Sequence, residues 1–227
     1  MKRLTLLTVL GFICCISLSA FYPNKNLKQG TINYDIKISG KEEMPETMKE
    51  MFKNSSMTFI WSKNRSRTKM DLGHAKVDVI NNGEKALMLM NMMNQKYASK
   101  MTKEELQKYQ QEQKGTDYSI EKTDQTREIA GYTCKKAVMK LERKNKTMNM
   151  DYWYTNKIQA PKASMQYAHG DIKGFPLMME FNRNRMNMQF KATSIDQSKP
   201  ARSNFNLTIP DGYTEKSLEE LKQMRGR

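Results

Sequence analysis

A regular alternation of apolar and polar side chains is the feature that most constrains this chain. From Gly30 to Ser39, the residues Ile32, Tyr34, Ile36 and Ile38 alternate with Thr, Asn, Asp and Lys. A period of two places the two kinds of side chain on opposite faces of a β-strand. The same spacing recurs in five further sets: Met57, Phe59 and Trp61; Val77 and Val79; Met148, Met150, Tyr152 and Tyr154; Met186, Met188, Phe190 and Ala192; Phe205, Leu207 and Ile209. We therefore expect antiparallel strands with one apolar face.

Three stretches have a helical period instead. Residues 44–54 place apolar side chains at i, i+4, i+7 and i+8, which predicts an amphipathic helix. Residues 102–113 and 217–224 each begin with a capping box, in which Thr or Ser is followed three residues later by Glu. These patterns predict a mainly β (α+β) fold with a short C-terminal helix, in which a curved antiparallel sheet covers its apolar face by closing into a barrel or by curling over one or two helices.

The N-terminus has the pattern of a secretory signal peptide. Lys2 and Arg3 precede an apolar run over residues 4–16, and small residues lead to Ala20. The run is shorter than the roughly 20 residues that span a bilayer, which favours a cleaved signal over an uncleaved anchor. We expect residues 1–20 to be removed and residues 21–227 to form a single domain, since no linker or repeat divides them. The mature protein would be periplasmic or extracellular.

The charge balance points to anionic surfaces. The chain has 39 Lys and Arg against 24 Asp and Glu, a net charge of +15. Such a charge favours peripheral contact with an anionic membrane surface. We expect no nucleic-acid partner, because the export signal argues against it and no basic block is interleaved with stacking aromatics. Cys134 is the one cysteine beyond the signal peptide, so it is either buried as a small apolar residue or paired between chains.

Catalytic motifs are scarce. The chain has two histidines, His74 and His169, and lacks the Gly-x-Ser-x-Gly, His-Glu-x-x-His and glycine-rich phosphate-loop patterns. Two Ser-x-x-Lys matches, at Ser66 and Ser119, are expected by chance in a lysine-rich chain. We therefore expect a protein that is not an enzyme and that has no metal or other cofactor.

Several short motifs are familiar as a group. Residues 129–137, 152–155 and 173–177 resemble the succession GYxCxKA, WYT and GxPL of exported Bacteroidota proteins. Those proteins form the domain of unknown function family 4412 and the related GLPGLI family. Because residues 174–179 depart from the GLPGLI pattern, the resemblance favours the former. It implies a fold similar to the carriers LolA and LolB, an incomplete barrel around a helix with a hydrophobic cavity. It implies no activity and no functional residue.

Methionine is the most unusual component, with 20 residues, many in pairs on the same alternating strands. Thioethers bind Cu(I), which allows a Met-rich periplasmic copper-binding protein. Methionine also fills cores and adapts to ligands of variable shape. Our leading hypothesis is a non-enzymatic envelope protein whose half-barrel binds a lipid or lipidated partner. A scaffold or interaction protein with a filled core is the other alternative. The residues expected to line the cavity are Met48, Phe52, Trp61, Met150, Tyr152, Met186, Met188 and Phe190.

Overall fold

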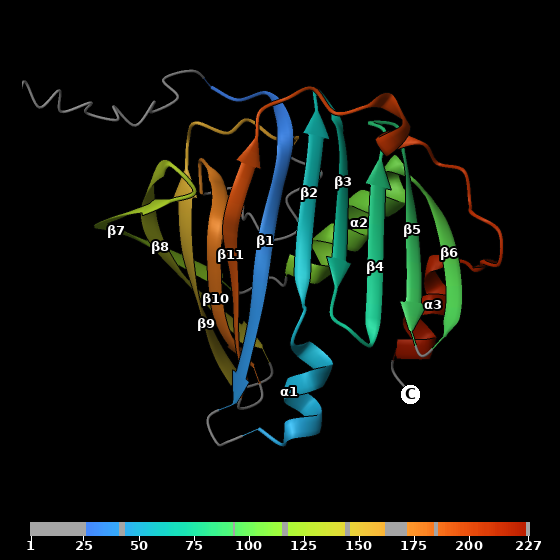
Figure 1. Cartoon of the computed structure of the whole chain (residues 1–227), viewed down its shortest axis with the longest axis horizontal. Helices are drawn as coiled ribbons and strands as arrows, with labels where there is room; N and C mark the ends of the chain where they lie inside the picture. The colour runs from blue at the N-terminus through green and yellow to red at the C-terminus, as the bar shows by residue number, and fades with distance from the viewer. Residues whose placement is uncertain are drawn as a thin grey trace, which may run out of the picture.

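Most strands that follow one another in the chain pair side by side, and the described strands form one twelve-stranded sheet (Figure 1). The computed structural model describes residues 26–40, 44–92, 94–114, 118–143, 146–161, 172–183 and 186–225. The predicted signal peptide lies outside these ranges. The first half of the chain contributes β1 (Gln29–Gly40), β2 (Ser56–Ser62), β3 (Arg65–Asp71), β4 (Ala75–Asn81), β5 (Lys85–Met92) and β6 (Gln95–Thr102). The second half of the chain contributes β7 (Tyr118–Ile129), β8 (Tyr132–Arg143), β9 (Lys146–Thr155), β10 (Phe175–Arg183), β11 (Met186–Asp196) and β12 (Thr214–Glu215).

The strand order brings the two halves together at β1. The order across the sheet is β12-β6-β5-β4-β3-β2-β1-β11-β10-β9-β8-β7, so β1 pairs antiparallel with both β2 and β11. All pairs are antiparallel except the short pairing of β12 with β6. The prediction of a mainly β fold built on an antiparallel sheet is confirmed.

In the described part of the chain, three α-helices accompany the sheet, all near their predicted positions: α1 (Glu46–Phe52), α2 (Lys103–Lys114) and α3 (Leu218–Arg225). Both predicted capping boxes are present. The amide N–H of Glu105 bonds to the Thr102 hydroxyl, and that of Glu220 bonds to the Ser217 hydroxyl. Among the described residues, no helix has the length and apolar character needed to cross a membrane.

Helices α2 and α3 lie on one face of the sheet, which we call the inner face, behind the strands in Figure 1. Leu106 of α2 and Leu221 of α3 are buried against Met88, Met90 and Met101 of β5 and β6. The β-strand alternation therefore places these methionines in a packed core.

The prediction of a strand at Phe205, Leu207 and Ile209 is wrong. Phe205 ends a short 3-10 helix, η2 (Arg202–Phe205), and residues 206–213 form no strand. Leu207 and Ile209 instead pack on the outer face of the sheet, against a cluster of buried β4, β5 and β6 side chains. Leu207 and Ile209 alternate with polar residues because one side of this extended segment packs on the sheet. The sheet is apolar on both faces at this position.

The half of the sheet from β1 to β8 curls around the main core. The Tyr34 hydroxyl on β1 donates a 2.9 Å hydrogen bond to the Pro176 carbonyl oxygen on β10, across the intervening β11. The ring of Phe59 on β2 stacks on that of Phe175, with centroids 5.0 Å apart. Contacts between strands that are not neighbours require strong curvature, as in the half-barrel that was predicted.

Candidate ligand-binding face and adjoining groove

The inner face of the curled half carries an unbroken line of apolar side chains. Each member lies directly opposite the next on the neighbouring strand. Directly opposed side chains contact one another across an antiparallel sheet. We call this line the apolar row: Ile120 of β7, Met139 of β8, Met150 of β9, Phe181 of β10, Met188 of β11 and Ile38 of β1.

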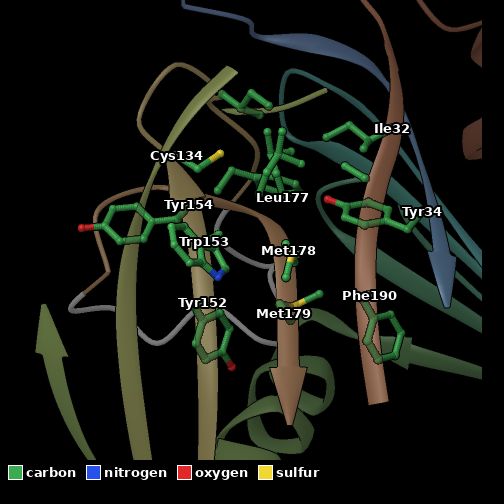
Figure 2. Packing of buried hydrophobic residues seen from close by; sticks show 14 of the residues in the cluster. Ile32, Tyr34, Cys134, Tyr152, Trp153, Tyr154, Leu177, Met178, Met179 and Phe190 are labelled. Atoms are coloured by element: carbon green, nitrogen blue, oxygen red, sulfur yellow. The ribbon is translucent and has the colours of Figure 1, made fainter. Parts of the chain in front are cut away.

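Exposure changes in steps along the strands. One step from the apolar row, toward the end of β9 at Thr155, Tyr152, Met179 and Phe190 lie side by side and are buried (Figure 2). In the apolar row itself, Met139 and Met150 are buried, but the other four members are half-buried. One step in the opposite direction, Tyr118, Met148 and Met186 are half-buried, and Leu141, between the first two, is buried. The apolar interior is therefore packed at one end and accessible at the other, which we call the open end.

The opposite end of the interior is filled by aromatic rings. Trp61 is fully buried, stacks on Phe59 with a centroid distance of 5.5 Å, and lies 6.2 Å from the Phe175 ring. Leu177 and Cys134, both labelled in Figure 2, complete this packing. This end has the character of an ordinary protein core.

The eight predicted lining residues therefore fall into three places. Met186 and Met188 lie at the open end. Met48 and Phe52 are half-buried on α1, and the Phe52 ring meets the His74 ring edge-on at 5.4 Å. The four others are buried side chains of the packed interior: Trp61, Met150, Tyr152 and Phe190.

Sequence reasoning missed three half-buried members of the open end. Ile38, Ile120 and Phe181 each follow the period-two pattern of their own strand. That pattern assigns a residue to a face, but the strand register decides which residues lie opposite one another. The register is a tertiary property and had no signal in the sequence.

A groove of about 450 Å³ adjoins the open end, between α1 and the last residues of β1. It is lined by residues 36–39 of β1, by Lys49, Phe52 and Lys53 of α1, and by Asn187 and Gln189 of β11. The three lysines Lys37, Lys49 and Lys53 are exposed, so their ammonium groups can meet anionic groups of a ligand.

The outer face opposite the apolar interior carries a buried aromatic ring covered by cations. The Arg127 guanidinium lies 4.4 Å from the centroid of the Trp153 ring, and the Lys136 ammonium lies 5.7 Å from it. Lys136 also forms a 2.7 Å ion pair with Asp151. Long basic side chains thus bury Trp153 on a face that its strand position predicts to be solvated.

Reactive groups are few in the described structure. Burial raises the pKa of the Cys134 thiol to about 12, and the charge of Glu128 adds to this rise. A thiol with such a pKa is protonated at neutral pH and is a poor nucleophile. Within the described ranges, no three His, Cys, Asp or Glu side chains lie close enough together to hold a metal ion.

Both Ser-x-x-Lys matches lie on strands. Ser66 and Lys69 are on β3, and Ser119 and Lys122 are on β7. Residues three apart in a regular strand point to opposite faces. In each pair, the serine and the lysine therefore lie on opposite faces of the sheet. The lysine cannot act as a base for the serine in this arrangement.

Comparison with known proteins identifies the family. No curated protein matches the sequence. Among solved structures, Mycobacterium tuberculosis lipoprotein LppX aligns with a TM-score of 0.36 and 11% identity, over 75% of this chain and 88% of that one. A family model described as N-glycanase peptide, N-terminal domain, matches residues 32–218. This family is neither of the two that the short motifs suggested, and the chain belongs to the N-glycanase peptide, N-terminal domain family.

Proposed function

We propose that this protein is a non-enzymatic envelope protein that binds the apolar part of a lipid or lipidated partner at the open end of its half-barrel. The observation that carries the proposal is the apolar row, which crosses six strands and has four members that are only partly buried. A contiguous apolar surface that remains accessible to solvent marks a binding site.

The composition of this surface suits a flexible chain. Methionine side chains are unbranched and polarizable, so Met148, Met186 and Met188 can repack around ligands of different shapes. The half-buried ring of Phe181 stacks on the buried ring of Phe190, with centroids 5.9 Å apart, so Phe181 offers a fixed, flat apolar wall. The net charge of +15 would hold an anionic headgroup near the protein.

A binding role fits the chemistry better than a catalytic one. The Cys134 thiol is protonated at neutral pH, and the two Ser-x-x-Lys pairs are divided by the sheet. Export through the N-terminal signal would place the protein where membrane lipids are available. The localisation and the absence of catalysis are parts of this proposal.

The proposal is tested by native mass spectrometry of residues 21–227, purified without detergent from the compartment to which the signal delivers them. An added mass of several hundred daltons that fragments as a lipid supports it. An added mass of copper would instead favour the Cu(I) hypothesis. A bare chain that also fails to bind a dansyl-labelled fatty acid at micromolar concentration contradicts it and favours the filled scaffold.

A pair of substitutions to aspartate separates binding from folding. Met188→Asp puts a charge into the apolar row, whereas Asn149→Asp puts the same charge on the exposed outer face of β9, away from the groove. We expect Met188→Asp to reduce fatty-acid binding at least tenfold while Asn149→Asp binds like the wild type. Circular dichroism of both variants checks that the sheet is retained. Equal binding by the two variants would place the ligand elsewhere.

The family match favours a second candidate, in which the domain assists an N-glycanase by binding its glycoprotein. The matched region, residues 32–218, begins in β1 and ends in α3. This candidate predicts that residues 21–227 bind an N-glycosylated protein more tightly than its deglycosylated form and release no glycan. Surface plasmon resonance and mass analysis of the glycoprotein provide the two measurements.

A further inference from the structure

Strand β1 extends beyond the strand that covers its edge. Its pairing with β2 ends at Asp35 and Ser56, whereas its pairing with β11 continues to Gly40. Among the described strands, residues 36–40 therefore have a neighbour on one side only. Their length is about 16 Å at roughly 3.3 Å per residue.

The backbone groups on this free edge point away from the sheet. The amide N–H of Ile36 donates a 3.0 Å hydrogen bond to the Ser55 carbonyl oxygen, on the β2 side. In an antiparallel strand, alternate residues direct both backbone groups to the same side. The N–H and C=O of Ile38 therefore point to the β2 side as well, where no described residue forms a hydrogen bond with them.

Helix α1 stands beside this edge instead of a strand (Figure 1). The groove of about 450 Å³ separates the two, and its far wall includes the half-buried ring of Phe52. A free strand edge flanked by a helix is the arrangement in which some domains bind an extended peptide as an added strand. Main-chain hydrogen bonds then provide affinity, and the helix side chains provide specificity.

The charges around the groove indicate the chemistry of the partner. Lys37, Lys49 and Lys53 line it, and none of the described lining residues carries a carboxylate. Lys49 forms an ion pair with Glu46 at 3.2 Å, and Lys53 forms one with Glu50 at 3.1 Å. Exposed pairs of this kind are worth about 0–1 kcal/mol, so they do not prevent an ammonium group from meeting another carboxylate.

We propose that the free edge of β1 at residues 36–40 binds an extended acidic peptide as an added antiparallel or parallel strand, held between β1 and α1. Peptide side chains on one side would meet Phe52, and acidic side chains would meet the lysines. A second copy of this chain fits less well, because two copies of β1 paired edge to edge would each bring a flanking α1 into the space needed by the other.

The test selects seven-residue peptides from a random phage-displayed library on residues 21–227, with the Ile38→Pro variant used for counter-selection. Proline removes the Ile38 N–H and fills the groove with its ring, and free strand edges tolerate proline. The matched control, Ile38→Val, keeps the N–H. We expect enriched peptides in which acidic and apolar residues alternate. In fluorescence anisotropy they should bind Ile38→Pro at least tenfold more weakly than Ile38→Val.

Circular dichroism shows whether the proline variant folds. If it does not, a charge-reversal variant provides the test instead. Lys37→Glu should weaken the same peptides at least threefold, and amide hydrogen exchange at Ile38 should slow when the peptide is bound. The inference is overturned if no acidic peptide is enriched, or if the enriched peptides bind wild type and both variants equally. It is also overturned if the wild type dimerises through this edge and binds no peptide.

Discussion

The Tyr34 hydroxyl donates a buried 2.9 Å hydrogen bond to the Pro176 carbonyl oxygen, and so joins β1 to β10 across β11. A hydrogen bond between strands that are not neighbours helps to hold the sheet in its curled form. Burial, and to a smaller degree the nearby Cys134, raises the pKa of Tyr34 well above its ordinary value. The phenol therefore stays a hydrogen-bond donor throughout the physiological pH range.

Removing this hydroxyl should loosen the curl. We expect Tyr34→Phe to lower the free energy of unfolding by about 1–3 kcal/mol, because the Pro176 carbonyl is left buried without its donor. Urea unfolding followed by circular dichroism measures the change. Tyr97→Phe is the control, since the Tyr97 hydroxyl bonds only to the exposed Gln95 side chain next to it. Equal losses in the two variants would contradict the role of the buried bond.

Cys134 should make stability fall at high pH. Its folded-state pKa is about 12, above the ordinary value of 9.0, because the thiol is buried. As pH rises past 9, the unfolded state loses this proton first, so unfolding becomes easier by up to about 1.4 kcal/mol per pH unit until the folded pKa is reached. The free energy of unfolding of Cys134→Ala should therefore fall less steeply between pH 9 and 11.

The same thiol should resist modification. We expect Ellman's reagent at pH 8 to react with Cys134 only after unfolding in urea, since the side chain is fully buried. Fast reaction with the native protein would show that this part of the core opens readily, and would also allow the pairing between chains that the sequence left open.

Two methionines should differ sharply in their effect on stability. Met150 is 6% exposed in the apolar row, whereas Met92 at the end of β5 is 37% exposed. We expect Met150→Ala to cost about 2–5 kcal/mol through the cavity it leaves. Met92→Ala should change stability by no more than about 0.5 kcal/mol. Similar losses in urea unfolding would show that the described interior is not packed around Met150.

The extended segment after η2 should be needed to cover the outer face. Leu207 packs over the buried outer cluster that includes Leu87 and Leu89, whereas its neighbour Thr208 is exposed. Leu207→Asp should cost about 1–3 kcal/mol, because a charge would replace an apolar contact. It should also increase the binding of a hydrophobic dye and cleavage of the segment by protease. Thr208→Asp should change neither, and a dye response in both variants would refute the covering role.

The sequence predicted those strands and helices whose signals lie within a few neighbouring residues. The period of two placed β1 and β11 correctly because each of these strands has one apolar and one largely polar face. It also placed β2 and β9, although Ile60 and Trp153 are buried on their opposite faces. The capping boxes placed α2 and α3 because the cap bonds lie within a single helical turn. β5 was harder to predict, since Leu87 and Leu89 are buried on one face and Met88 and Met90 on the other. A strand buried on both faces has no alternation to detect.

The candidate site depended on relations that no local pattern contains. The apolar row exists because six strands adopt one register, and a shift of a single residue in any strand would turn its side chain to the other face. The curl that buries Trp61, Tyr152 and Phe190 but leaves Met186 and Met188 half-exposed also arises from contacts between distant strands.

The sequence by itself determined the apolar and polar faces of its strands, the ends of its helices and the excess of positive charge. These properties depend on residues close together in the chain. Only the tertiary structure decided that Leu207 and Ile209 cover the sheet without joining it, which methionines are core and which are accessible, and that β1 has a free edge beside α1. Such outcomes depend on which strands pair and in what register, and that choice is made by the packing of the whole chain.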